Sequence, residues 1–161
     1  MYRYGRGFQQ NIQEAEKWSL QAALHGNADA QFEEGSEHPM EAAIWYRKAA
    51  ERGHRQAQQR LGMLYANGYG VAKDSQEAAK WFLRAVGQGD THSQRILGDM
   101  YRNGEGVSQD YQESFKWYRK AAEHRDAEAQ SNLGDMYRKG KGTTQDYEEA
   151  LNWYRMAAEQ E

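Results

Sequence analysis

Residues 61–85 have the sequence LGMLYANGYGVAKDSQEAAKWFLRA, and the same pattern returns twice further along the chain. It comes back as LGDMYRNGEGVSQDYQESFKWYRKA at 97–121 and as LGDMYRKGKGTTQDYEEALNWYRMA at 133–157, so that each copy begins 36 residues after the one before. A fixed period of this length is typical of stacked supersecondary units, each of which contacts only its neighbours. The sequence therefore predicts a repeat protein in place of one closed core.

Each copy predicts two helices joined by a glycine-containing turn. In the first complete copy, the spacing predicts a helix over 55–67 that ends at Gly68, because glycine tolerates the positive φ of a helix C-terminal turn. The second helix is expected to begin at Asp74. It carries Trp81 and Phe82 on an apolar stripe of helical period. The predicted fold class is all-α, a solenoid of helix-turn-helix repeats of 36 residues.

The predicted helix starts carry acceptor side chains. Four of them fit a capping box, in which an acidic or amide residue is followed three positions later by glutamate: Asp74 and Glu77, Asp110 and Glu113, Asp146 and Glu149, Asn11 and Glu14. Asp90 and Asp126 are candidate caps for first helices, and His38 followed by Pro39 indicates one more second-helix start. These signals place five second helices, each around one of the five tryptophans.

The chain is expected to form a single repeat domain over residues 1–161. Its expected units are a partial repeat at 1–26, a shortened repeat at 27–53, and full repeats at 54–89, 90–125 and 126–161. The spacing between Trp18 and Trp45 is nine residues short of the period, so the second unit has lost its LGxxYxxGxG segment. That loss predicts a shortened or broken first helix. Residues missing from the sequence at hand would leave the same gap.

The two ends of the chain are expected to be uncovered. The opening MYRYGRG matches 100–106 and 136–142, so the chain begins inside a unit, and it stops after a second helix without a polar capping helix. Trp153 and Tyr154 are expected to lack a covering unit. Either the chain is a piece of a longer protein, the favoured interpretation, or its ends pack against a partner or a second copy.

Composition excludes several classes of function. The net charge of −3 gives no basic excess for phosphate contacts, so nucleic acid binding is not expected. The apolar runs are too short for membrane insertion, and the absence of cysteine removes disulfides and thiolate chemistry. The first residues lack the apolar stretch of a signal peptide, which favours the cytoplasm. A periplasmic chain whose signal had been removed would look the same.

The pattern LGxxYxxGxGVxxDxxxAxxWYxKAA resembles the Sel1-like repeat, a relative of the tetratricopeptide repeat. Three units match across 54–161, and two earlier ones match in their second halves. The resemblance implies a right-handed α/α superhelix that serves as an adaptor or scaffold for protein complexes and needs no cofactor. In bacteria, similar proteins also act as immunity proteins that neutralise toxic enzymes, and some have been linked to cell-wall chemistry.

Twelve recurring residues are expected to be structural. They are expected to lie where the two helices of a unit meet, and the glycines among them to let those helices approach closely. These positions are Leu61, Gly62, Tyr65 and Trp81, then Leu97, Gly98, Tyr101 and Trp117, and finally Leu133, Gly134, Tyr137 and Trp153.

Partner binding is expected at first-helix positions that differ between units. By resemblance to tetratricopeptide repeats these positions line a concave groove, and here they are His92, Arg95, Asp99, Arg102, Asn103, Glu128, Asp135, Arg138 and Lys139. Their mixed charge suits a polar or charged peptide. The alternative is a solvated helix face with local pairs. The carboxylate clamp of some tetratricopeptide proteins is not expected, because Asp99 and Asp135 stand where its asparagine would be.

No catalytic or metal-binding residues are predicted. The five histidines have no HxxxH or HExxH spacing, and the glycine-containing loops end helices, whereas phosphate-binding loops open them. The chain is therefore expected not to be an enzyme but to bind a protein or peptide. Two alternatives remain open: an inhibitor or immunity protein that blocks a toxic enzyme, and a hydrolase or small-molecule binder. A closed pocket with an acid, a base and a nucleophile would favour the hydrolase.

Overall fold

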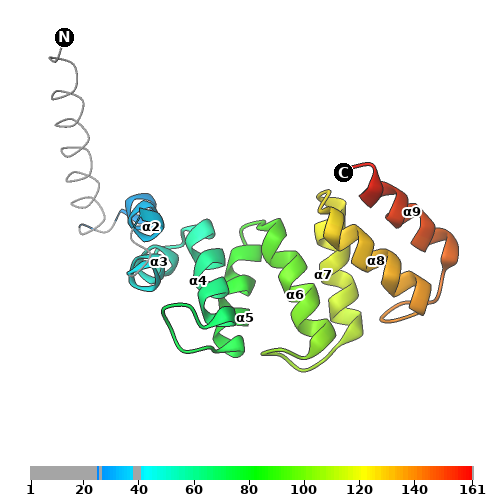
Figure 1. The fold of residues 1–161 in the computed structure, drawn as a ribbon, viewed down its shortest axis with the longest axis horizontal. Coiled ribbons are helices and arrows are strands. Elements are labelled where there is room, and N and C mark those ends of the chain that lie inside the picture. The colour runs from blue at the N-terminus through cyan, green and yellow to red at the C-terminus, as the bar shows by residue number, and fades with distance from the viewer. Residues whose placement is uncertain (1–24, 26, 38–40, 161) are drawn as a thin grey trace, which may run out of the picture.

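A computed structural model gives the structure of the chain, and it describes residue 25 and residues 27–37 and 41–160. These residues form eight helices and no strands, and the helices follow one another in a curved row (Figure 1). The helices are α2 (Ala28–Glu37), α3 (Ala42–Glu51), α4 (Arg55–Asn67), α5 (Ser75–Val86), α6 (Thr91–Asn103), α7 (Tyr111–Glu123), α8 (Ala127–Lys139) and α9 (Tyr147–Ala158). The predicted all-α repeat architecture is confirmed.

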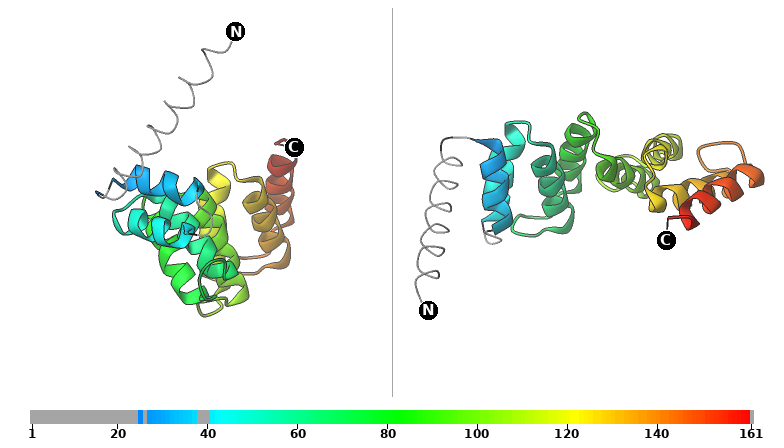
Figure 2. Two further views of the ribbon diagram at one scale, coloured as in Figure 1. Left: turned by 60° about the vertical axis from the view of Figure 1, so that its left-hand side comes forward. Right: turned by 90° about the horizontal axis from the view of Figure 1, so that it is seen from above.

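Each described helix packs mainly against the next one in sequence, from α2 through to α9. The right-hand view of Figure 2 shows the same row from above, with the helix pairs placed one after another. Contacts made mainly between sequence neighbours are typical of a solenoid. The opening MYRYGRG, the pair Asn11 and Glu14, the helix around Trp18, and the start at His38 and Pro39 lie outside the described residues.

The predicted helix ends are confirmed from α4 onward. Asp74 Oδ1 accepts a hydrogen bond from the Glu77 backbone N–H at 2.9 Å, and the aspartates that begin α6, α7, α8 and α9 cap in the same way. Gly68 ends α4 at φ 76°, with a glycine of positive φ at the same place in the two later units. Local side-chain chemistry therefore sets these boundaries.

The capping boxes are only half formed. The backbone N–H of Asp74 donates to the Tyr65 carbonyl at 2.9 Å, and the N–H groups of Asp110 and Asp146 donate to the equivalent tyrosine carbonyls. Because these N–H groups already have a partner, the glutamates are not needed there. Glu77 instead forms an ion pair with Lys80 at 2.9 Å. The recurring tyrosine thus holds the start of the second helix to the first helix through its backbone.

The shortened second unit has the predicted defect in its first helix. α2 has 10 residues, whereas α4, α6 and α8 have 13 each. The second helix of that unit, α3, begins at Ala42. Glu41 occupies the N-cap position without a side-chain hydrogen bond, and its carbonyl accepts from the N–H groups of Ile44 and Trp45. This start therefore lacks the aspartate cap that fixes the later ones.

The apolar core lies between consecutive units. Each of three core clusters combines the second helix of one unit, the first helix of the next, and a tryptophan from that next unit's second helix. Trp81 packs in this way on α3 and α4, Trp117 on α5 and α6, and Trp153 on α7 and α8. These three tryptophans therefore contact the first helix of their own unit, which is where the sequence placed them, and also the second helix of the preceding unit.

Within a unit, an aromatic ring lies against the helix glycine. A Cβ added to Gly98 would lie 2.5 Å from Tyr118 Cδ1, and Gly62 and Gly134 face Phe82 and Tyr154 in the same way. The leucine beside each glycine is fully buried, and the tyrosine four residues further on is partly buried. The close approach predicted for these glycines is therefore present, and its partner is the residue after the tryptophan.

The exposed apolar surface on α9 is not the predicted one. Trp153 packs on the preceding unit and Tyr154 on Gly134, so both point back into the chain. The large apolar side chains that α9 exposes are Tyr147, Leu151 and Met156, at 68%, 48% and 44% of their surface. The expectation of an uncovered aromatic pair was wrong, because Trp153, like Trp81 and Trp117, packs toward the preceding unit.

Candidate partner-binding surface

The nine residues predicted to bind the partner lie on the first helices of two consecutive units, α6 and α8. Five belong to α6 and four to α8, at positions that recur on one side of each helix. We call this set of nine the first-helix face. Among its members, His92, Asn103, Glu128, Arg138 and Lys139 are exposed, and the others are partly buried.

Arg95 is largely committed to contacts within the protein. Its guanidinium lies 3.4 Å from Asp99, 3.6 Å from Asp126 and 3.1 Å from Glu128, and its side chain is only 14% exposed. Asp126 is also the N-cap of α8. Arg95 therefore ties α6 to the beginning of α8, and its charge is already balanced by three carboxylates.

Asp99 collects donors from three side chains, so it too is occupied. The Tyr118 hydroxyl donates to Asp99 Oδ1 at 2.6 Å, and Arg102 Nη2 does so at 2.7 Å. Burial raises the pKa of Tyr118, so its hydroxyl stays protonated and remains a donor. Arg102 also reaches Asn132 Oδ1 at 3.0 Å, which links α6 to α8 a second time.

The next unit repeats this arrangement around Asp135. Tyr154 Oη and Lys139 Nζ each lie 2.5 Å from the carboxylate, and Arg138 Nη2 lies 3.2 Å from it. Hydrogen bonds lower the pKa of Asp135 to about 2, and the bond from Lys139 has a larger effect than the bond from Tyr154. Asp135 is therefore a fixed negative charge that organises the donors of α8 and α9.

Acid should weaken this arrangement in a predictable direction. The lowered pKa of Asp135 means that its contribution to stability is complete above the ordinary carboxylate pKa of about 4 and is lost as the pH falls toward 2. Asp135→Asn cannot titrate. We expect the stability advantage of the wild type over this variant to stay constant near neutral pH and to shrink in acid. Urea unfolding of both proteins over that pH range measures it, and an advantage that grows in acid would contradict the assignment.

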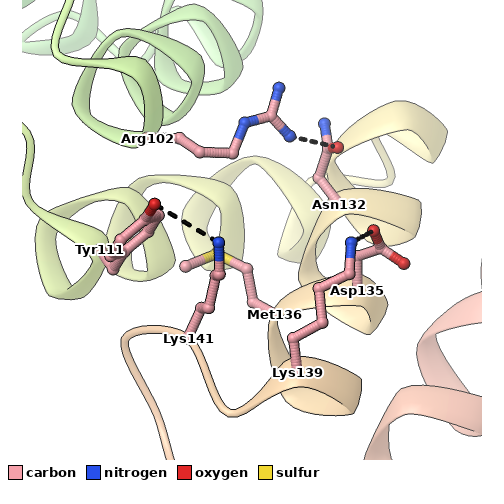
Figure 3. Close-up of a pocket in the computed structure, with 7 residues that line it drawn as sticks. All are labelled: Arg102, Tyr111, Asn132, Asp135, Met136, Lys139 and Lys141. Carbon is pink, nitrogen blue, oxygen red and sulfur yellow. Dashed lines mark hydrogen bonds and ion pairs between the residues drawn. The ribbon is translucent and has the colours of Figure 1, made fainter.

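A small hollow lies where α6, the start of α7 and the end of α8 meet (Figure 3). Its volume is about 70 Å³ and it is open to solvent, so it is too small for a cofactor-sized ligand. We call it the cationic hollow. It is lined by Arg102, Tyr111, Asn132, Asp135, Met136, Lys139 and Lys141.

The residues predicted from the sequence make up only part of this hollow. Arg102, Asp135 and Lys139 belong to the first-helix face, whereas Tyr111, Lys141 and the other two lining residues were not predicted. Lys141 stands in the loop after α8, where the earlier copies have Tyr69 and Glu105. That variation was a usable signal, but it lies outside the helix positions that the repeat pattern marks as groove-lining.

The described residues add no sign of metal chemistry or of a membrane span. In the part of the chain that the structure describes, no group of three or more metal-ligand side chains could hold an ion. None of the helices built from those residues is both long and apolar enough to cross a membrane.

Comparison with protein families decides the relationship. The family model for the Sel1 repeat matches residues 1–27, 36–54, 55–90, 91–126 and 127–161, which is nearly the whole chain. The chain belongs to the Sel1 repeat family. A search of curated protein sequences finds no match.

Two solved Sel1 repeat structures resemble the chain strongly. One is c5321, described as a protective antigen present in uropathogenic Escherichia coli strains and displaying an SLR fold, with 40% identity and a TM-score of 0.85. The other is a Sel1 repeat protein from Oxalobacter formigenes, with 38% identity and a TM-score of 0.86. Each match covers 90% of this chain, but only 33% of the first relative and 63% of the second.

A third structure, Helicobacter pylori cysteine rich protein B, is 23% identical with a TM-score of 0.58. That match covers 74% of this chain and 92% of the relative. At this level of identity it supports the shared fold and nothing more. The first two neighbours agree with an all-α solenoid of Sel1 repeats.

Proposed function

We propose that this Sel1 repeat chain binds a partner protein or peptide through the first-helix face of α6 and α8. The observation that carries the proposal is the contrast between a closely repeated scaffold and a face that changes from unit to unit. Helices α6 and α8 align in sequence, but equivalent positions on them differ in charge. Glu128 stands where α6 has His92, and Lys139 stands where α6 has Asn103. Sel1 repeat proteins are generally protein-interaction scaffolds, which supports the same function.

The arrangement of side chains favours binding over catalysis. Asp99 and Asp135 are each held by a tyrosine hydroxyl and by cations, and Arg95 is balanced by carboxylates. Groups fixed in this way are poorly suited to accept or transfer a proton, and the hollow beside them is small and open. The Sel1 repeat fold is typically a non-enzymatic scaffold. The immunity function is a narrower case of the same binding activity, and it would be recognised from a captured partner that is an enzyme.

Partner capture by variants of the two helix surfaces tests the proposal. The groove variant combines Arg102→Gln, Glu128→Gln and Arg138→Gln; glutamine avoids placing a new carboxylate beside Asp99 or Asp135. We expect it to lose at least about tenfold in affinity for the partner, as removal of interface hot spots does. The measurement is affinity capture from the native source with protein identification by mass spectrometry, followed by titration.

The matched control changes charges on the second helices. Lys80→Gln with Lys116→Gln alters two exposed lysines, whose side chains are 68% and 63% exposed, on α5 and α7. This variant should capture the partner as the wild type does. A groove variant that captures normally, together with a control variant that does not, would reject the first-helix face as the binding surface.

A further inference from the structure

We propose that the cationic hollow receives the carboxylate of an aspartate or glutamate side chain from an acidic segment of the partner. This proposal rests on the proposed function, because it names the chemistry of the partner at one place on the binding surface. It follows from the charges that line the hollow, from the unit-specific origin of those charges, and from the size of the space between them.

Lys141 supplies a positive charge that the described protein does not neutralise. Its ammonium lies 4.7 Å from the centre of the Tyr111 ring and 3.4 Å from the Tyr111 hydroxyl, and no carboxylate of the described residues forms an ion pair with it. The cation–π contact holds the ammonium beside the Tyr111 ring, as Figure 3 shows. An ammonium has three donors, so Lys141 retains capacity for an incoming oxygen.

The other two cations are already paired, and the hollow is still positive. Lys139 binds Asp135, and Arg102 binds Asp99 and the side chain of Asn132. The lining therefore carries three cations and a single carboxylate, that of Asp135. An anionic group that enters would meet Lys141 first and would be attracted by the other two cations at longer range.

The repeat itself shows that the fold does not require these charges. At the positions 36 residues earlier, the three cations are replaced, in order, by Ala66, Asn103 and Glu105, and Asp99 takes the place of Asp135. The equivalent place one unit earlier thus carries two carboxylates and no cation. Because the same helix-turn-helix geometry forms with either set, the charge reversal is available for recognition, and it makes the last junction differ from the one before it.

The shape of the hollow favours an acidic side chain over a nucleic acid. A space of about 70 Å³ takes a carboxylate and part of its methylene stem, with the Met136 side chain and the Tyr111 ring as apolar walls. A nucleic acid strand would need a track of cations for successive phosphates. The hollow instead gathers its three cations, Arg102, Lys139 and Lys141, in one place.

A defined peptide tests the hollow directly. The probe is an octaglutamate peptide with blocked ends, titrated into the isotope-labelled protein at low salt, with octalysine and an oligothymidylate as comparison ligands. We expect octaglutamate to shift the amide resonances of residues 139–142 and of Tyr111, and added salt to weaken the binding. Shifts confined to other regions, or shifts at these residues with the oligothymidylate and none with octaglutamate, would overturn the proposal.

The variant K139N/K141E installs the residues that the preceding unit carries, so it should fold as the wild type does. We expect its affinity for octaglutamate to fall at least about tenfold. The single variant K141M, which keeps an apolar stem near the Tyr111 ring and removes the charge, should show a smaller loss. Unchanged affinity in both variants would overturn the proposal.

The captured partner separates this proposal from the proposed function. If the groove variant loses the partner while K139N/K141E retains it at wild-type affinity, the proposal that the cationic hollow binds a carboxylate is rejected. The first-helix face then remains the binding surface. If neither variant loses the partner, the proposed function is rejected as well. Loss of the partner by both variants, together with octaglutamate binding to the wild type, is the result we expect.

Discussion

Gly106→Ala is expected to lower the free energy of unfolding by about 3 kcal/mol or more. Gly106 has φ 71°, and a Cβ at this position would lie 2.0 Å from the Ser75 carbonyl oxygen and 2.8 Å from the Gln76 backbone N. The neighbours are backbone atoms of the preceding unit, which cannot rotate away as a side chain could. The substitution should therefore push one unit away from the other, and urea unfolding followed by circular dichroism should measure the loss.

Gly89→Ala is the matched control for this prediction. Gly89 also has a positive φ, 80°, but no atom lies within 4 Å of the Cβ that alanine would add. Its loss should be limited to the cost of the left-handed conformation, about 1–2 kcal/mol. Equal losses for the two variants would show that the close approach between units at Gly106 contributes nothing. A Cβ added to Gly142 would lie at the same distance, 2.0 Å, from the Tyr111 carbonyl oxygen, so Gly142→Ala provides an independent repeat of the test.

Trp81→Ala is expected to cost about 3–5 kcal/mol, as for other large buried aromatic residues. Trp81 is 6% exposed and packs in the cluster formed by α3 and α4, so its loss removes contact area between two units. Because a solenoid is held together by such neighbour contacts, α2 and α3 should uncouple from the remaining helices. Amide hydrogen exchange should be faster in α3 and unchanged in α8 and α9.

Leu83→Ala on the same helix serves as the comparison. Leu83 is 42% exposed, and its truncation should change stability by no more than about 0.5 kcal/mol. If amide hydrogen exchange in Trp81→Ala became faster evenly over all helices, this would contradict the location of Trp81 at the contact between α3 and α4. It would indicate a role inside one unit, which is where the sequence pattern alone had placed the tryptophans.

The features that the sequence predicted well are local in the chain. Asp74 and Gly68 act on backbone groups a few residues away, so their residue types alone indicate where α5 begins and α4 ends. The capping glutamates were misjudged because the competing acceptor, the Tyr65 carbonyl, is nine residues upstream. The start of α3 has no side-chain cap at Glu41, so no residue type there marks it in the sequence.

Features that depend on packing between units could not be predicted in the same way. The stripe containing Trp81 shows which side of α5 is buried, but not that this side meets α3 as well as α4. The hollow depends on pairs such as Tyr111 and Lys141, which are 30 residues apart and meet only when two units stack. Likewise, the role of Arg95 emerged only from its contact with the cap of α8.

The most direct test of the binding surface is lysine labelling of the complex with the captured partner. The chain offers lysines in both places: Lys139 and Lys141 line the cationic hollow, and the exposed Lys80 and Lys116 lie on the second helices. We predict that the partner protects Lys139 and Lys141 from acetylation and leaves Lys80 and Lys116 as reactive as in the unbound protein. Protection of Lys80 and Lys116, with Lys139 and Lys141 fully reactive, would contradict the account.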